Sequence, residues 1–265
     1  MSTTLLLYKQ VKALNRDEHK AFRLKQANEC SFAAGTHLVP LAGLEFYQAA
    51  RHYPIVFIGE GEKAAPIALL GLKEGQNTCV DANGQWLANQ YVPAFVRRYP
   101  FVLAQGSNED FTVCIDTEFQ GWNEEEGQRL FAEDGGNSEY LDEMIRFLQN
   151  FTHEMDRTRR FVGRLQELGL LEKRSFKLSH VSGESFVLSD FLAVDEEKFL
   201  KLGDEQVLAL HKDGFLGWVY AHLMSLGNIN QLFERHLASR SAPADTARAS
   251  DEAAKAPAKK SRAKR

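Results

Sequence analysis

The chain has 265 residues, of which 44% are hydrophobic and 26% charged, and its formal net charge is −4. This length and apolar content suffice to bury a core as one large domain or two small ones. From residue 240 onward eight Lys and Arg face three Asp and Glu, a net of +5 that leaves −9 for the preceding residues. An acidic body argues against a nucleic-acid-binding domain, because phosphate contacts require clustered Lys and Arg.

The cysteines and the start of the chain indicate the compartment. Cys30, Cys79 and Cys114 are widely spaced and form no Cys-x-x-Cys pair, which is typical of free thiols in a reducing compartment. The first twenty residues lack the basic region and the small-residue cleavage site of a signal peptide. No apolar run approaches the roughly 18 residues of a membrane span. We therefore expect a cytoplasmic protein without a membrane span, unless it follows a leaderless secretion route.

The first 50 residues give a weak pattern followed by a short helix. Residues 1–36 are polar, and their basic residues follow only a loose helical spacing, so we expect an N-terminal arm. The segment Leu44–Arg51 is predicted to be helical. This helix should end before Pro54, because the residue that precedes a proline is sterically pushed out of the helical region.

Between residues 55 and 118 the apolar residues follow the spacing of β-strands separated by turns. Asn83-Gly84 is the strongest hairpin signal in this stretch. We expect six short strands in one mainly antiparallel sheet. The expected strands are Ile55–Ile58, Ile67–Leu72, Thr78–Val80, Trp86–Ala88, Phe101–Leu103 and Phe111–Ile115.

A polar, acidic loop leads into a long helical pattern. Apolar residues between positions 140 and 168 recur at steps of three and four, which predicts one long amphipathic helix, or two in series that meet near Thr158. Asn137 or Ser138 is placed to cap its start. Gly169 is placed to end it in a left-handed turn.

The remaining sequence predicts a hairpin, a last helix and a tail. Ser175–Val181 and Ser185–Leu192 flank the turn residues Ser182-Gly183, and Phe215–Leu237 has the periodicity of an amphipathic helix. Beyond Ala238 the chain holds no large apolar residue, so it cannot bury enough surface to offset its ordering entropy. We expect a disordered basic tail at 239–265.

These elements together predict an α+β fold. Residues 37–238 are expected to form one packed unit, in which an antiparallel β-rich half (37–120) packs with a mainly helical half (137–238).

A seven-residue pattern occurs twice in the β-rich half. Arg51–Phe57 and Arg97–Leu103 both read Arg-x-Tyr-Pro-apolar-Val-apolar, and each precedes a polar turn and another apolar run. This repeat indicates two related strand–hairpin units, produced either by duplication or by coincidence.

The residues of this repeat are the best candidates for a ligand site. Guanidinium groups bind carboxylates or phosphates bidentately, and neighbouring aromatic rings stack on them. If the two units pack pseudo-symmetrically, these groups converge on an anionic ligand or a peptide terminus. The competing interpretation is that the arginines pair internally with acidic residues and the tyrosines complete the core. The predicted set is Arg51, Tyr53, Trp86, Arg97, Arg98, Tyr99 and Asp116.

Known catalytic and metal-binding motifs are absent from the sequence. The eight histidines form no His-x-x-x-His, His-Glu-x-x-His or His-x-His pattern, and there is no Gly-x-Ser-x-Gly. Asp116 and Glu118 share one face of a strand, and paired carboxylates could act in acid–base chemistry, but no partner stands at ligand spacing. We therefore assign no catalytic residue, no metal and no cofactor.

Three blocks of sequence carry a family resemblance. They are Tyr53–Phe57 with Ala68–Leu72, Gly84–Trp86 with Tyr91–Phe101, and Val194–Lys198 with Gly214–Phe215 and Tyr220–Leu226. Together they resemble the SapC family of bacterial proteins over roughly residues 37–236. The resemblance implies a cytoplasmic or surface-associated bacterial protein of about this size, with no established catalytic residues. It links the chain to surface layers or outer-membrane transport by name and gene grouping only.

Three hypotheses of function follow from the sequence. The first is a non-enzymatic binding or adaptor protein that recognises a protein, a peptide or an anionic ligand near Arg97, Arg98 and Tyr99. The second is an enzyme, or an accessory subunit of a protein-modifying enzyme, with a pocket built by Tyr53, Trp86, Arg97 and Asp116. The third is a nucleic-acid-associated regulator that acts through the basic tail. A concave pocket with a perturbed acid or base would favour the enzyme, and a flat apolar patch on the last helix would favour the adaptor.

Overall fold

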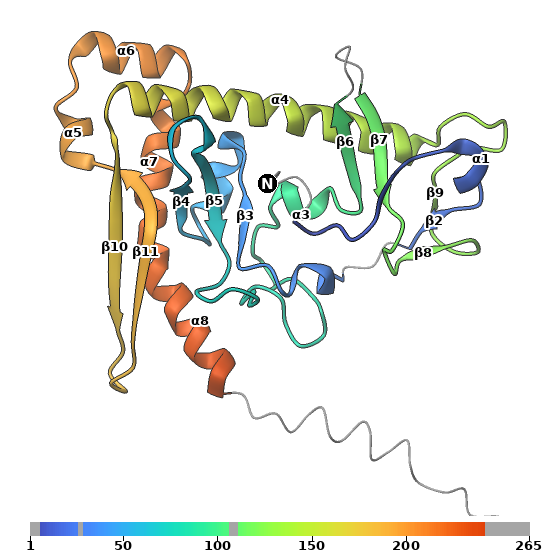
Figure 1. The fold of residues 1–265 in the computed structure, drawn as a ribbon, viewed down its shortest axis with the longest axis horizontal. Helices are drawn as coiled ribbons and strands as arrows, with labels where there is room; N and C mark the ends of the chain where they lie inside the picture. The colour runs from blue at the N-terminus through green and yellow to red at the C-terminus, as the bar shows by residue number, and fades with distance from the viewer. Residues whose placement is uncertain (1–5, 26–28, 106–110, 242–265) are drawn as a thin grey trace, which may run out of the picture.

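A computed structural model of the chain describes residues 6–25, 29–105 and 111–241. Figure 1 shows one long helix, α4, that runs across the whole molecule above the sheets. The helices are α1 (Arg16–His19), α2 (Phe46–Ala49), α3 (Ala94–Arg97), α4 (Glu139–Glu167), α5 (Glu196–Leu200), α6 (Asp204–Lys212), α7 (Leu216–Ser225) and α8 (Ile229–Ser241), with single 3₁₀ turns at Ser31–Ala33, Gly43–Glu45, Gly61–Lys63 and Leu226–Asn228. The strands are β1 (Val11–Ala13), β2 (Arg23–Leu24), β3 (Leu38–Pro40), β4 (Ile55–Ile58), β5 (Ala65–Leu69), β6 (Phe101–Gln105), β7 (Phe111–Asp116), β8 (Trp122–Asn123), β9 (Gln128–Arg129), β10 (Leu171–Ser179) and β11 (Ser185–Val194).

Antiparallel strands dominate the N-terminal half and helices the C-terminal half, which confirms the predicted α+β class. The prediction of one sheet between residues 55 and 118 is wrong. β4 and β5 belong to a five-stranded sheet of order β10-β11-β4-β5-β3, whereas β6 and β7 join β1 in a separate three-stranded sheet. The apolar side chains of these two groups pack into different cores: Phe101 and Ile115 pack with residues from the first turns of α4, and Ile55 and Phe57 pack with α7.

The segments Thr78–Val80 and Trp86–Ala88 also differ from the prediction. They form no strands, and a single bridge joins Val80 to Trp86. The turn between them is held by the Asp81 carboxylate, which accepts hydrogen bonds from the backbone amides of Asn83 and Gln85, both at 2.9 Å. Local side-chain bonding of this kind replaces the ladder of a longer hairpin.

The predicted hairpin of the C-terminal half is confirmed and is longer than expected. β10 and β11 pair from Leu171↔Val194 to Ser179↔Ser185. β11 also pairs with β4 through Leu192↔Phe57, so the hairpin completes a sheet that the N-terminal half begins. In Figure 1 the two long strands stand at the edge of the sheet beside α8.

The helical pattern at 140–168 forms one continuous helix, α4. The Ser138 hydroxyl accepts the Leu141 amide at 3.1 Å and caps its start. At its end Gly169 has φ +64°, and the Leu170 amide returns to the Leu165 carbonyl at 2.9 Å, as expected for a left-handed cap. Thr158 is buried within the helix and its hydroxyl accepts the Gly43 amide at 2.8 Å.

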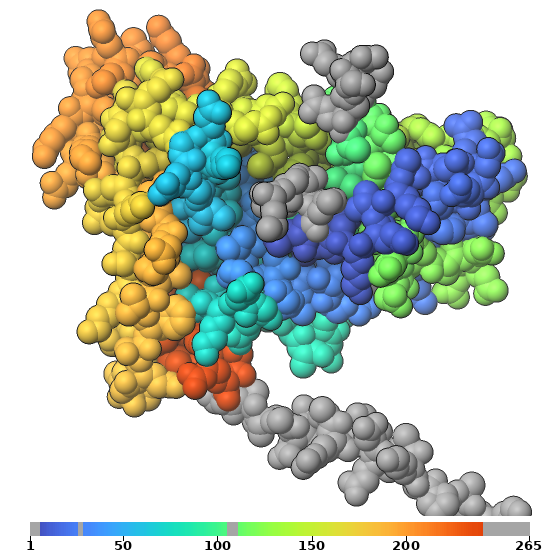
Figure 2. Space-filling model, in the orientation of Figure 1, coloured from blue at the N-terminus to red at the C-terminus, as the bar shows by residue number. Residues whose placement is uncertain are grey.

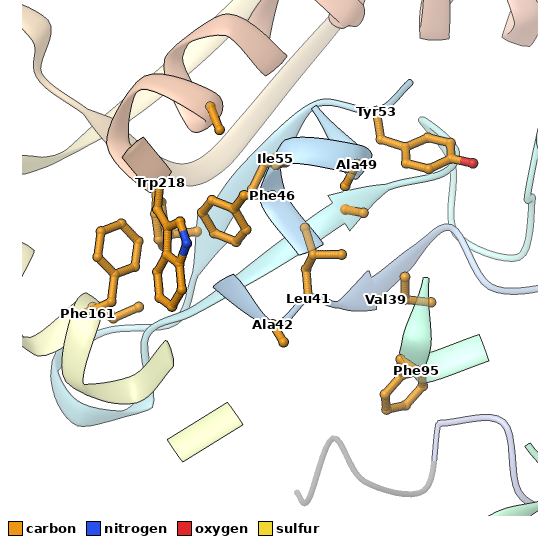
Figure 3. Packing of buried hydrophobic residues seen from close by; sticks show 14 of the residues in the cluster. Val39, Leu41, Ala42, Phe46, Ala49, Tyr53, Ile55, Phe95, Phe161 and Trp218 are labelled. Atoms are coloured by element: carbon orange, nitrogen blue, oxygen red, sulfur yellow. The ribbon is translucent and has the colours of Figure 1, made fainter. Parts of the chain in front are cut away.

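The main core lies between α4, α7 and the five-stranded sheet. Figure 3 shows the Trp218 indole between the rings of Phe46 and Phe161, at centroid distances of 6.0 and 5.3 Å. A Cβ at Gly43 would overlap the Trp218 ring, so only glycine lets the chain pass this close to the indole. Close packing of this kind makes the position of α7 relative to residues 43–46 well defined.

The N-terminal segment takes part in two of the sheets. β1 pairs with β7, and β2 lies between β8 and β9. The space-filling view in Figure 2 shows this segment, in blue, lying against the green strand region.

The predicted last helix, Phe215–Leu237, is divided into α7 and α8 by the 3₁₀ turn at Leu226–Asn228. The tail was expected from residue 239, but α8 continues to Ser241, and the Arg240 guanidinium contacts the Glu184 carboxylate at 3.0 Å. The remaining tail prediction falls on residues 242–265, which lie outside the described residues. No helix in the described part of the chain has the length and apolar content needed to cross a membrane.

Candidate functional site

The two copies of the Arg-x-Tyr-Pro pattern stand at similar places in the fold, but the Tyr99-Pro100 peptide bond is cis, whereas the Tyr53-Pro54 bond is trans. The first copy follows the single-turn helix α2, the second begins at the last residue of α3, and each leads into the first strand of an antiparallel hairpin. In each copy the proline carbonyl accepts an amide from the partner strand, Leu69 to Pro54 at 3.0 Å and Asp116 to Pro100 at 2.9 Å. The strands belong to different sheets, so the side chains of the two copies enter two separate networks.

The first network joins three of the predicted site residues. The Trp86 Nε1 donates to the Tyr53 hydroxyl at 2.9 Å, and that hydroxyl donates to the Tyr91 carbonyl at 2.6 Å. The Tyr91 hydroxyl donates to Glu45 Oε1 at 2.8 Å and accepts from Arg97 at 3.1 Å. Tyr91 therefore joins two groups: its backbone carbonyl binds Tyr53 and, through it, Trp86, and its hydroxyl binds Glu45 and Arg97.

Arg97 is the exposed end of this network. Its Nε donates to the Val92 carbonyl at 3.0 Å, and its guanidinium lies between the Tyr91 and Phe147 rings, 5.6 and 5.2 Å from their centroids. Both cation–π contacts hold the group in one orientation. Arg97 is thus a fixed positive charge at the surface.

The buried carboxylate of this network is Glu45, which sequence reasoning did not single out. Burial raises its pKa, although the Ala94 and Ala42 amides, at 2.6 and 3.0 Å, and the Tyr91 hydroxyl favour the charged form. Burial and the neighbouring Glu45 raise the pKa of Tyr91 to about 12. With all its oxygens accepting hydrogen bonds, Glu45 ties the turn at residues 43–45 to α3.

The second network surrounds Asp116, which is fully buried. Its carboxylate accepts hydrogen bonds from the backbone amides of Lys9, Gln10 and Glu118 and from the Tyr99 hydroxyl, at 2.9 to 3.1 Å. Burial alone would raise the pKa of Asp116, but these four donors together hold it below its usual value. The aspartate therefore fixes the N-terminal segment against β7.

Arg98 and Arg51 have opposite environments. Arg98 is only 6% exposed, and its guanidinium lies 4.2 Å from the Phe95 ring centroid and 5.1 Å from that of Phe151. Burial lowers the pKa of Arg98. Arg51 is exposed, and its guanidinium donates to the Gln48 side chain at 3.5 Å. The structure thus brings Tyr53, Trp86 and Arg97 together, joins Tyr99 to Asp116, and leaves Arg51 apart.

A groove that the sequence reasoning missed lies on the C-terminal half of α4. It has a volume of about 370 Å³ and is lined by Arg157, Arg160, Gly163, Arg164, Glu167, Asp213 and Phe215. We call it the arginine groove. Its signal in the sequence is the spacing of the three arginines at i, i+3 and i+7, which places them on one face of a helix. The segment at 213–215 is brought to this face by the turn between α6 and α7.

A second feature is a group of exposed apolar side chains on the turn at residues 43–45, on α2 and on α7. It consists of Leu44, Tyr47, Tyr220 and Met224, which are 57%, 53%, 49% and 77% exposed. We call it the apolar patch. The Tyr47 hydroxyl lies against Gly217, so the tyrosine crosses from α2 onto α7. Tyr220 and Met224 are one turn apart and share the outer face of α7.

The chemistry of the described residues offers no metal centre, since no group of three or more His, Cys, Asp or Glu side chains converges among them. A comparison with models of known protein families shows to which family the chain belongs. The SapC family model matches residues 14–232. The chain belongs to the SapC family. No curated protein and no solved structure matches the chain.

The SapC match confirms the resemblance drawn from the sequence and starts earlier than expected, at Leu14 rather than near residue 37. The first network, the arginine groove and the apolar patch lie within the matched range, whereas two donors of the second network, the Lys9 and Gln10 amides, precede it. The SapC match gives a family and no reaction, so the function must be argued from these features.

Proposed function

We propose that the protein is a non-enzymatic binding or adaptor protein, and that its apolar patch docks an apolar segment of a partner protein. The observation that carries this proposal is the exposure of four large apolar side chains, Leu44, Tyr47, Tyr220 and Met224, together with the contact of Tyr47 with α7 at Gly217. Isolated exposed apolar side chains are ordinary on protein surfaces, but a contiguous group of large ones is typical of an interaction site. Tyrosine and methionine are also enriched in interfaces.

The charges beside the patch favour a partner segment with an acidic residue at one end. Arg51 lies two residues after the end of α2 and four residues after Tyr47. Within the described part of the chain no carboxylate lies within ion-pair distance of Arg51. Its positive charge therefore complements an acid on the partner.

Of the three arginines in the predicted site, Arg51 and Arg97 are exposed and can contact a partner, whereas Arg98 is buried. Arg97 stays available for a carboxylate or phosphate because the Tyr91 and Phe147 rings hold its guanidinium at the surface. A cytoplasmic location and an association with surface-layer or outer-membrane transport systems belong to the same proposal. The family resemblance supports that association by name alone.

The test uses the full chain and charge substitutions in exposed residues. A partner captured from the source cells is purified, and its Kd is measured for the wild type, Met224→Glu, Arg51→Glu and the control Leu208→Glu. Leu208 lies on α6 and is 50% exposed. We expect M224E to weaken binding about thirtyfold, because a buried apolar contact is replaced by a charge, and R51E to weaken it less.

Two outcomes would contradict the proposal. If L208E weakens binding as much as M224E, the loss reflects general surface charge and not the patch. If sedimentation shows that the wild type is a dimer and that M224E is a monomer, the patch is occupied by a second copy of the chain.

A further inference from the structure

We propose that the arginine groove binds the phosphoryl groups of a small phosphorylated compound. This site is separate from the docking of a partner on the apolar patch and does not depend on it. The proposal stands on the three arginines that line the groove, the open floor at Gly163 and the fixed orientation of Arg157.

Arg157 is held before any ligand arrives. Its Nη2 donates to the Asp213 carbonyl at 3.1 Å, and its guanidinium lies 4.6 Å from the centroid of the Trp218 ring. Trp218 is itself fixed in the main core, being 2% exposed. A side chain that is already ordered loses little conformational entropy on binding, which favours ligand capture.

Arg160 and Arg164 supply the accessible charges. Arg160 is exposed, and in the described residues no carboxylate lies within ion-pair distance of it. Arg164 pairs with Glu167 at 2.9 Å, but the Glu167 side chain is 66% exposed. Exposed pairs of this kind contribute little to stability, so a phosphoryl group can displace Glu167 from the guanidinium.

Three carboxylates in or beside the groove compete with any anionic ligand for the arginines. Glu167 and Asp213 line the groove, and the Glu154 carboxylate stands 3.7 Å from the Arg157 guanidinium. A ligand must carry enough negative charge to compete with these three carboxylates.

The arrangement of the arginines favours phosphoryl groups over a single carboxylate. Arg157 and Arg164 are seven residues apart, about 10 Å along the helix axis, with Arg160 between them. A carboxylate can satisfy one guanidinium fork, whereas linked phosphoryl groups present several oxygens to all three. The floor is open because a Cβ at Gly163 would meet no atom within 4 Å, and a volume of about 370 Å³ suits a small ligand.

The test is calorimetric titration of the full chain with inorganic pyrophosphate. We expect Arg160→Gln to weaken binding about tenfold, because one charge-assisted contact is lost. Glu167→Gln should strengthen binding, because it removes the competing carboxylate from Arg164. The matched control is Arg159→Gln on the same helix: Arg159 is paired with Asp156 and does not line the groove, so its loss should leave the Kd unchanged.

Changes in the backbone amide NMR shifts of the wild type locate the bound pyrophosphate. The amides of Gly163 and Gly214 should shift at the lowest pyrophosphate concentrations. Equal losses in R159Q and R160Q would assign the binding to general charge and overturn the proposal. Citrate that binds as tightly as pyrophosphate would overturn its preference for phosphoryl groups. Circular dichroism checks the folding of R160Q; should that variant unfold, Arg164→Gln replaces it, and an unchanged Kd there would also overturn the proposal.

Discussion

His222 shows how one buried side chain joins two distant strands. Its Nε2 accepts the Val194 amide at 3.0 Å, so the ring proton sits on Nδ1 and is donated to the Ile55 carbonyl at 2.9 Å. The side chain is fully buried on α7, and burial lowers its pKa from 6.5 to about 4. A neutral imidazole therefore bridges β11 and β4 from the helix that covers them.

The stability of the protein should depend on pH through His222. Between pH 6.5 and about 4 the unfolded histidine binds a proton and the folded one does not, so the free energy of unfolding falls as the pH falls through this window. The expected loss is about 3 kcal/mol for a shift of this size. Urea unfolding of the wild type and of His222→Asn at several pH values measures it.

The difference in the free energy of unfolding between the wild type and H222N isolates the contribution of His222. Other groups titrate in both proteins; among them Glu45 has a raised pKa, which makes the free energy of unfolding rise as the pH falls. H222N should be less stable at pH 7, because one bridging hydrogen bond is lost. Parallel pH profiles for the two proteins would show that the histidine does not control acid sensitivity.

At the scale of residues the sequence could not distinguish Arg97 from Arg98. Both stand in the same motif beside Tyr99, and both were predicted to bind a ligand. Successive residues of a helical turn point about 100° apart, so on α3 one guanidinium lies at the surface and the other lies over the Phe95 ring. Which of the two is exposed depends on where α4 crosses α3, and a local pattern does not contain that information.

At the scale of elements α4 is the main support of the fold, and Thr158 is its contact with the turn at residues 43–45. The Thr158 hydroxyl donates to the Glu154 carbonyl at 2.6 Å and accepts the Gly43 amide at 2.8 Å. The periodicity has its weak spot at Thr158 because a polar side chain here faces the core. That polar group satisfies a buried amide from another element.

Replacing Thr158 with valine should therefore destabilise the protein by about 1–3 kcal/mol, because the shape is kept while the Gly43 amide loses its acceptor. Thr158→Ser keeps the hydroxyl and should cost less. Thermal and urea unfolding of the two variants provide the comparison. A valine variant as stable as the serine variant would mean that this hydrogen bond adds nothing to stability.

Elements set by local chemistry were predicted well, and the assignment of strands to sheets was not. The Ser138 cap, the left-handed turn at Gly169 and the hairpin around Gly183 all follow from the conformations that these residues favour. The division of β4–β5 and β6–β7 between two sheets follows from which helices cover them, and that is tertiary information. Short apolar runs are compatible with either arrangement.

At the scale of the whole molecule the basic tail should contribute little to folding. A chain that ends at Ser241 should differ from the full chain by less than about 0.5 kcal/mol in its free energy of unfolding, because the removed residues contain no large apolar side chain. A chain that ends at His236 loses Leu237, which is 8% exposed, and should be about 2 kcal/mol less stable. Urea unfolding of both truncations measures the difference; a large loss on removal of residues 242–265 would contradict the prediction.

Neither the apolar patch nor the arginine groove could be located from the sequence, because each is built from distant segments. The patch combines Leu44 and Tyr47 with residues of α7 more than 170 positions later, and the groove combines α4 with the turn at Asp213. What the sequence does contain is half of each site: the arginine spacing on α4 and an apolar face on α7.

The pairing of β11 with β4 also bears on how the protein is made in the cell. The Leu192↔Phe57 contact joins residues 135 positions apart. At about 5–20 residues per second, roughly 7 to 27 seconds of translation separate the appearance of the two partners at the ribosome. During that interval β4 lacks the strand that finally pairs with it, so we expect its open edge and apolar side chains to be a binding site for chaperones, which pairing with β11 then closes.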